Sequence, residues 1–162
     1  YTRLALVVAA FMCGLALGGM WATKGLSLWA RPPRTWLIGV CMASAAFAVG
    51  FAPEVLSVAR VLAASWPPVA AGVLVFGVAL AGLLTGAAFP LAAAVHLESG
   101  PGATARSAGA MQAADHLGGA LGAAAIGSLL IPVLGVGSAL WVIAAWSLAG
   151  AIVLVRRRHP QP

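Results

Sequence analysis

Long runs of apolar and small residues dominate the chain, and charged side chains are almost absent from them. Of the 162 residues, 62% are hydrophobic and 7% are charged, whereas about a quarter of a soluble domain is charged. Too little polar surface remains to cover a globule in water. We therefore expect the apolar residues to face lipid or one another, as in a membrane protein.

Five of these runs are close to the length of a membrane-spanning helix. A hydrocarbon core of roughly 30 Å needs about 20 apolar residues in a helix, and the runs lack the alternation of barrel strands. The sequence predicts an all-α, polytopic transmembrane helix bundle with about five spans, at residues 4–23, 36–53, 69–95, 108–131 and 137–155. The stretch from Glu54 to Pro68 is either a short helix in the outer interface, with Arg60 reaching the headgroups, or a loop.

The positively charged residues lie between the apolar runs, and their distribution predicts an orientation. Short cytoplasmic loops carry an excess of Lys and Arg. One side of the predicted bundle collects Lys24, Arg31, Arg34, Arg106, Arg156, Arg157 and Arg158. The other side has Arg3 and Arg60. We expect an inner-membrane, multi-pass protein whose N-terminal end is outside and whose Arg-rich C-terminal tail is cytoplasmic.

No residues in the chain have the spacing of a catalytic or metal site. Cys13 and Cys41 fall in apolar runs at different depths, so we expect buried thiols and no disulfide. There is no C-x-x-C or H-E-x-x-H motif, and no Gly-rich nucleotide turn follows a strand. The net charge of +6 is spread over the gaps between spans, which indicates topology and no nucleic-acid partner. The sequence predicts no metal, no cofactor and no catalytic constellation in this segment.

Small residues recur at four-residue spacing on three of the predicted helices. In lipid, helices associate through small residues that let their backbones approach closely. The glycines predicted to lie at helix contacts are Gly14, Gly18, Gly82, Gly86, Gly118 and Gly122. Pro90 leaves the carbonyl of Gly86 without its helical hydrogen bond, so we expect a bend near the cytoplasmic end of the third span. Either a neighbouring helix or a cation or substrate would face that carbonyl.

Asp115 and His116 stand near the start of the fourth predicted span. On a helix, Asp115 shares a face with Gly118 and Gly122, so we expect its carboxylate to point into the bundle. An ionised carboxylate at the centre of a membrane helix costs about 2.5 to 3.5 kcal/mol, so such a group faces a cavity or a partner. Two interpretations are open: Asp115 binds a cationic substrate or a proton, or it accepts hydrogen bonds from backbone amides or Arg106. His116 is turned by about 100° and is expected either in the membrane interface or at a helix contact.

The third and fourth spans carry a recognisable pattern. The stretch GAAFPLAAAV at 86–95 is followed by AGAMQAADHLGGALGAAAIGSLLIPVLG at 108–135. This pattern resembles the membrane portion of spermidine synthase-like integral membrane proteins, in which a polytopic domain accompanies an aminopropyltransferase domain. The matching positions are Phe89, Pro90, Ala108, Gly109, Asp115, Gly118, Gly122, Pro132 and Gly135. The chain departs from the pattern at Gln112, where an aromatic residue is usual, and at His116, where an apolar one is usual.

The resemblance implies that residues 1–162 are a single transmembrane domain from a longer chain. Such a domain would anchor or supply a polyamine aminopropyltransferase domain outside this segment, which would use putrescine and decarboxylated S-adenosylmethionine. The helix pattern is also similar to half of a major facilitator-type secondary transporter lacking one helix, and a purely structural membrane bundle is a third reading. The expected partners are the lipid bilayer, the remaining part of the chain or a partner membrane subunit, and a polyamine.

Overall fold

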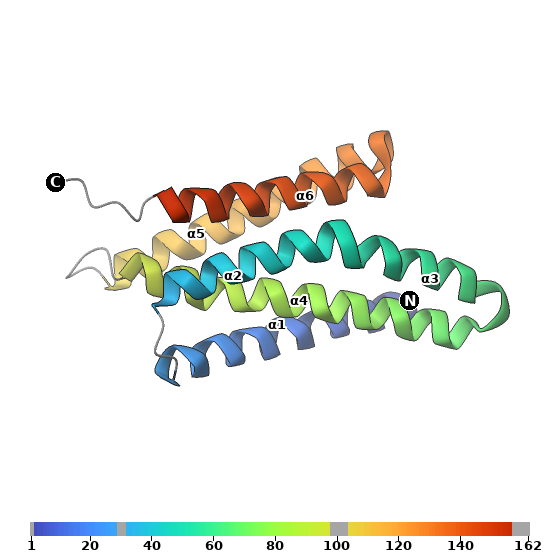
Figure 1. Ribbon diagram of the computed structural model, residues 1–162, viewed down its shortest axis with the longest axis horizontal. Helices are drawn as coiled ribbons and strands as arrows, with labels where there is room; N and C mark the ends of the chain where they lie inside the picture. The colour runs from blue at the N-terminus through green and yellow to red at the C-terminus, as the bar shows by residue number, and fades with distance from the viewer. Residues whose placement is uncertain (1, 29–31, 98–103, 157–162) are drawn as a thin grey trace.

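The chain forms a bundle of long helices (Figure 1). The computed structural model describes residues 2–28, 32–97 and 104–156. Every element in these ranges is helical, which confirms the predicted all-α class. The elements are α1 (Thr2–Leu28), α2 (Pro33–Ala46), the π-helical segment η1 (Phe47–Phe51), α3 (Ala52–Ser65), α4 (Pro67–Leu97), α5 (Thr104–Gly122), the π-helical segment η2 (Ala123–Leu130) and α6 (Ile131–Arg156). The predicted loop cations Arg31, Arg157 and Arg158 lie outside the described residues.

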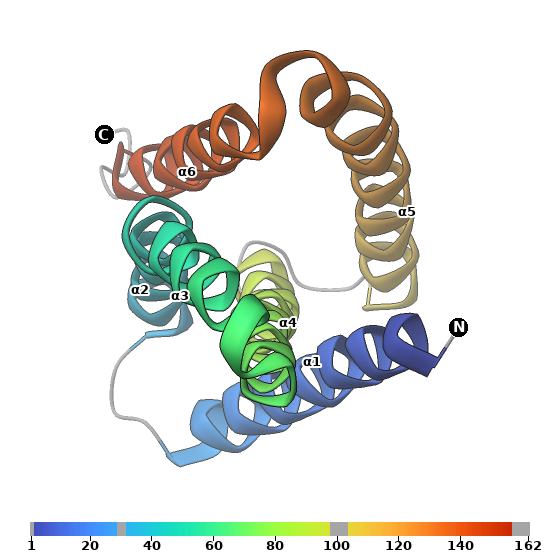
Figure 2. The same cartoon turned by 90° about the vertical axis from the view of Figure 1, so that its right-hand side faces the viewer.

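The chain runs along the bundle five times. Four continuous helical stretches are long and apolar enough to cross a membrane: Thr2–Leu28, Pro33–Ser65, Pro67–His96 and Gly109–Arg156. The last stretch has 48 residues and leaves the helical region at Gly135, with φ 80° and ψ 169°. Figure 2 shows the chain reversing there between α5 and α6, so this stretch makes two antiparallel passes. The fold is that of a multi-pass membrane protein, with about five spans as predicted.

The second pass is longer than the predicted span 36–53. The helix continues through η1 and α3 to Ser65, so residues 54–65 form neither a separate interfacial helix nor a loop. Pro53 lies in the first turn of α3, where its missing amide hydrogen is tolerated, and the π-helical turn directly precedes it. α3 packs on α4, since a Cβ placed on Gly77 would lie 3.0 Å from a methyl carbon of Val55. This packing against α4 stabilises the helical conformation of residues 54–65, whose sequence is only weakly amphipathic.

Most of the helix ends that carry cations lie at one end of the bundle. α1, α4 and α6 end there and α2 and α5 begin there, on the left of Figure 1. We call this the basic end, defined by Lys24 of α1, Arg34 of α2 and Arg156 of α6. The opposite end contains the start of α1, the α3–α4 connection and the reversal at Gly135. The α3–α4 hairpin extends beyond the other helices at that end (Figure 1).

The backbones of α1 and α4 approach each other closely through glycine. A Cβ placed on Gly18 would lie well under 3.0 Å from the carbonyl oxygen of Leu83, and one on Gly86 equally close to that of Leu15. Both obstacles are backbone atoms, so no side-chain adjustment makes room. The glycines in such contacts are Gly14, Gly18, Gly82 and Gly86. The structure therefore places four of the six predicted packing glycines at one helix interface.

Pro90 lies inside α4, which continues as a helix to Leu97. The carbonyl oxygen of Gly86, which Pro90 cannot bond, is directed towards α1, because a Cβ on Gly19 would lie 3.6 Å from it. The sequence left two possible neighbours for this carbonyl, a helix or a bound cation or substrate. In the structure its neighbour is the helix α1. Beside this contact, the core of the bundle buries Leu91, Ala87 and Ala22.

The helix α5 stands apart from this close packing. A Cβ on Gly118 or on Gly122 would meet no atom within 4 Å, and Leu117 and Leu121 are exposed. The helix contact predicted for these two glycines is therefore absent from the described residues. Small residues at four-residue spacing make a flat face available to a partner, but they do not specify which helix occupies it.

Candidate functional site

Asp115 is exposed on α5. The helix begins at Thr104, so Asp115 lies roughly 16 Å along it at 1.5 Å per residue. Its side chain is 63% exposed, and the nearest basic group is that of the adjacent His116, with Nδ1 3.8 Å from Oδ2. The prediction that Asp115 points into the bundle is therefore wrong for the described helices. The side chain of His116 is 73% exposed, so of its two expected positions the described helices do not provide the helix contact. The side chain of Arg106 is outside the described part.

A different face of α5 is turned towards the bundle. Ala110, Met111 and Ala114 line a cavity between α5 and the helices α2, α4 and α6. Asp115 follows Ala114 and is therefore turned about 100° from it around the helix axis. The glycine spacing predicted that the face of α5 with Gly118 is turned towards the bundle. In the structure the face with Ala110, Met111 and Ala114 is turned towards it. The acid is at the margin of the cavity and does not line it.

The cavity at the basic end is bordered by one arginine and one histidine. Its volume is about 540 Å³, and Arg34 and His96 are its polar lining residues. Among the described residues, no Asp or Glu lines it. The cavity therefore offers an anion or a neutral group better electrostatic complementarity than a cation.

Arg34 also joins the second and fifth passes. It is half-buried, and its guanidinium donates a hydrogen bond to the backbone carbonyl of Leu154. The last four carbonyls of a helix have no partner within that helix, and Leu154 is in the last turn of α6. A cation at this position also opposes the negative end of the helix dipole. Arg34 thus caps α6 from α2.

Arg34→Gln should lower the free energy of unfolding of the bundle by about 1.5 kcal/mol, because it removes a charge-assisted hydrogen bond to a capped carbonyl. Unfolding of the detergent-solubilised protein, followed by circular dichroism during titration with sodium dodecyl sulfate, measures the change. Arg156→Gln is the matched control, since it removes the same charge from the same end at an exposed position. Equal stability of the two variants would contradict the capping role.

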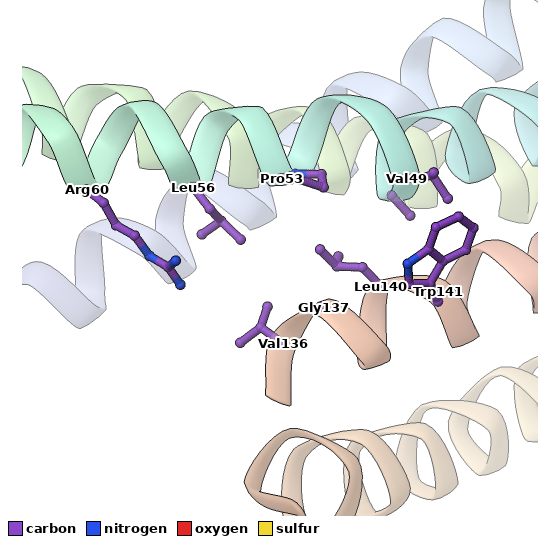
Figure 3. Close-up of a pocket in the computed structure, with 9 residues that line it drawn as sticks. Val49, Pro53, Leu56, Arg60, Val136, Gly137, Leu140 and Trp141 are labelled. Atoms are coloured by element: carbon purple, nitrogen blue, oxygen red, sulfur yellow. The ribbon is translucent and has the colours of Figure 1, made fainter. Parts of the chain in front are cut away.

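Two further cavities lie at the opposite end, and both are bordered by Arg60. The smaller, about 330 Å³, lies between α3 and the start of α6 (Figure 3). The larger, about 640 Å³, lies between α1, α3 and α4 and also includes Arg3. The sequence predicted only a topological role for Arg3, and for Arg60 a topological role or a position in the outer interface. It had no signal for this site, because nothing in the linear pattern indicates which helix ends converge around Arg60.

The described side chains provide no metal site. No group of three or more His, Cys, Asp or Glu residues among them is arranged to hold an ion. Cys13 is exposed and Cys41 is half-buried, so the expectation that both thiols are buried is wrong for Cys13. No protein-family model, curated protein or solved structure matches this chain.

Proposed function

We propose that this chain is the membrane domain of a spermidine synthase-like integral membrane protein and that it anchors an aminopropyltransferase domain. The observation that carries the proposal is that the family pattern falls on one structural unit. Pro90 lies in α4, Asp115 lies in α5, and Gly135 forms the reversal into α6. Gly135 is also the one described residue with a positive φ, so the last glycine of the pattern stands where the backbone requires it.

The charges around the cavities favour anchoring over supply of polyamine. A polyamine carries several positive charges and needs carboxylates or carbonyls to replace its hydration. The cavities at the two ends are bordered by Arg34 and His96, and by Arg60 and Arg3. Asp115, the acid of the predicted span, is exposed beside His116. A path for polyamine through these cavities would meet cations at both ends.

We further propose that the domain lies in the inner membrane with its basic end in the cytoplasm. Lys24, Arg34 and Arg156 belong to that end, while Arg3 and Arg60 belong to the other. An excess of Lys and Arg marks short cytoplasmic segments. The start of α1 is then outside, and the end of α6 is inside, on the side where a cytoplasmic enzyme domain finds its substrates.

A second candidate is half of a major facilitator-type transporter for a small solute. One observation favours it: cavities of about 540 and 640 Å³ are present at the two ends of the bundle. Their cationic lining favours a neutral or anionic solute. The two candidates predict different behaviour of the full-length protein.

In the full-length protein, Asp115→Asn should leave both spermidine production and polyamine uptake unchanged, because the carboxylate is exposed and borders no polyamine path. Production is measured with putrescine and decarboxylated S-adenosylmethionine in detergent, and uptake with labelled putrescine in proteoliposomes. Gln112→Ala, about one turn earlier on α5, is the matched control.

The unmodified protein separates the candidates. Aminopropyl transfer without uptake supports the anchoring role. Solute uptake with no aminopropyl transfer would contradict it and support the transporter half. Loss of putrescine uptake in Asp115→Asn, at normal expression, would show that polyamine does cross this domain and would overturn the anchoring role.

A further inference from the structure

Arg60 of α3 lies where two cavities adjoin. Figure 3 shows its side chain directed into the space between α3 and the start of α6, with Leu56 beside it and Val136 opposite. The same residue borders the larger cavity between α1, α3 and α4. The guanidinium of Arg60 therefore borders both cavities.

Nothing in the described part of the chain neutralises this charge. Arg60 has no hydrogen bond or ion pair to the described residues, and no described Asp or Glu lines either cavity. Arg3 adds a second positive charge to the larger one. Unpaired arginines on membrane helices are costly and generally mark a binding site or reach the headgroup region. The site is therefore complementary to an anion.

The position of Arg60 along the bundle indicates where that anion comes from. Arg60 is roughly 8 Å before the end of α3 at Ser65. Its cavities also include Arg3, in the first turn of α1, and Val136, next to the reversal at Gly135. The starts of α1 and α6 thus lie beside Arg60, and the starts of membrane-spanning helices are expected near the headgroups.

The remaining lining of both cavities is apolar. The larger cavity continues between α1 and α4 past Leu6, Leu74 and Val75, and the smaller one passes Leu140 and Trp141 of α6. We propose that Arg60, assisted by Arg3, binds the phosphate of an anionic phospholipid whose two acyl chains enter the two cavities. The planar guanidinium can donate two parallel hydrogen bonds to phosphate oxygens. Free phosphate would leave the apolar hollows empty, and a fatty acid would fill one of them.

Trp141 provides a direct readout, because it lines the smaller cavity with Arg60 (Figure 3). Phosphatidylglycerol with brominated chains is titrated into the full-length protein in a non-ionic detergent. We expect saturable quenching of tryptophan fluorescence, and the difference between the unmodified protein and Trp141→Phe isolates the contribution of Trp141. Arg60→Gln should raise the half-saturating lipid concentration roughly ten- to hundredfold, as loss of a charge-assisted hydrogen bond implies.

Three controls make the result decisive. Arg60→Lys keeps the charge but loses the two parallel hydrogen bonds, so its half-saturating concentration should lie between those of the unmodified protein and Arg60→Gln. Arg156→Gln, at the basic end, should not alter the binding. Brominated phosphatidylcholine, which carries no net charge, should quench without saturation. Equal saturable quenching by both lipids, or an unchanged half-saturation in Arg60→Gln, would overturn the proposal. Saturation by bromoundecanoate but not by phosphatidylglycerol would also overturn it, in favour of a fatty acid. The lipid comparison needs no variant, so it is decisive even where a substitution perturbs folding.

Discussion

Gly18→Ala should lower the free energy of unfolding of the bundle by about 3 kcal/mol, at the upper end of the cost of overpacking. The added Cβ would lie well under 3.0 Å from the carbonyl oxygen of Leu83. Because that oxygen is part of the α4 backbone, the clash is relieved only when α1 and α4 move apart. Separation weakens dispersion contacts and the weak Cα–H···O contacts that accompany close helix packing in membranes.

The effect should spread along the interface. Gly14 and Gly86 belong to the same contact, so a separation at Gly18 loosens their contacts too. We therefore expect the double variant Gly18→Ala, Gly86→Ala to be less destabilised than the sum of the two single variants. Once the helices have separated, the second methyl group no longer meets a backbone atom.

Gly19→Ala is the matched control, one residue away on the same helix. Its Cβ would lie 3.6 Å from the carbonyl oxygen of Gly86, an ordinary van der Waals distance. Both variants gain the same helix propensity from alanine, so their difference reports the contact alone. Titration with sodium dodecyl sulfate, followed by circular dichroism, gives the two free energies. Equal stability of Gly18→Ala and Gly19→Ala would show that the close approach of α1 and α4 does not hold the bundle together.

The sequence predicted the interface of α1 and α4 because both helices carry the small-residue repeat and both belong to the described chain. Four-residue spacing on α1 and α4 identified Gly18 and Gly86, and their helices meet. The same spacing on α5 identified Gly118, which faces open space. A small-residue repeat specifies how closely two helices can approach. Which helices approach depends on loop geometry and on the other contacts of the bundle, and the linear pattern does not contain these.

The positions of the charged side chains follow from the sequence less well than the glycine contact between α1 and α4. An acid in an apolar run is rare, and the glycines around Asp115 predict that its side chain points into the bundle. The bulkier Met111 lines the cavity instead, and Asp115 is exposed. The sequence predicted that Arg60 faces the headgroups or lies in a loop, yet it borders two cavities because α1 and α6 begin near it. Such convergence of distant segments is a property of the fold alone.

The second pass is longer than predicted, and this too depends on tertiary contacts that the sequence does not show. Residues 54–65 contain Glu54 and Arg60, so hydropathy ended the predicted span at residue 53. In the structure the helix continues because α3 packs along α4, where Val55 contacts Gly77. A helix of 33 residues is about 50 Å long, so it is longer than the hydrocarbon core. The extra turns form the hairpin that extends past the site at Arg60.

Gly135→Ala should destabilise the α5–α6 hairpin by up to about 3 kcal/mol, because the native backbone at this position is closed to residues with a Cβ. Gly135 has φ 80° and ψ 169°, a combination that is essentially restricted to glycine. The chain reverses direction at this residue, so the strain cannot be relieved without changing how α6 leaves α5. The variant should therefore lose stability in the detergent titration and also expose the end of α6 to labelling.

A comparison with Gly137→Ala tests this account. Gly137 lies two residues further on in α6, where a Cβ would meet no atom within 4 Å and φ is not positive. Alanine there should be neutral or slightly stabilising, since it raises helix propensity. A cysteine introduced at Ala151, which is buried in the last two turns of α6, reports on the far end of that helix through its reaction with a membrane-impermeant maleimide. If Gly135→Ala matched Gly137→Ala in both stability and labelling, the reversal would not depend on the left-handed backbone at Gly135, and the structural role given to the last glycine of the family pattern would be lost with it.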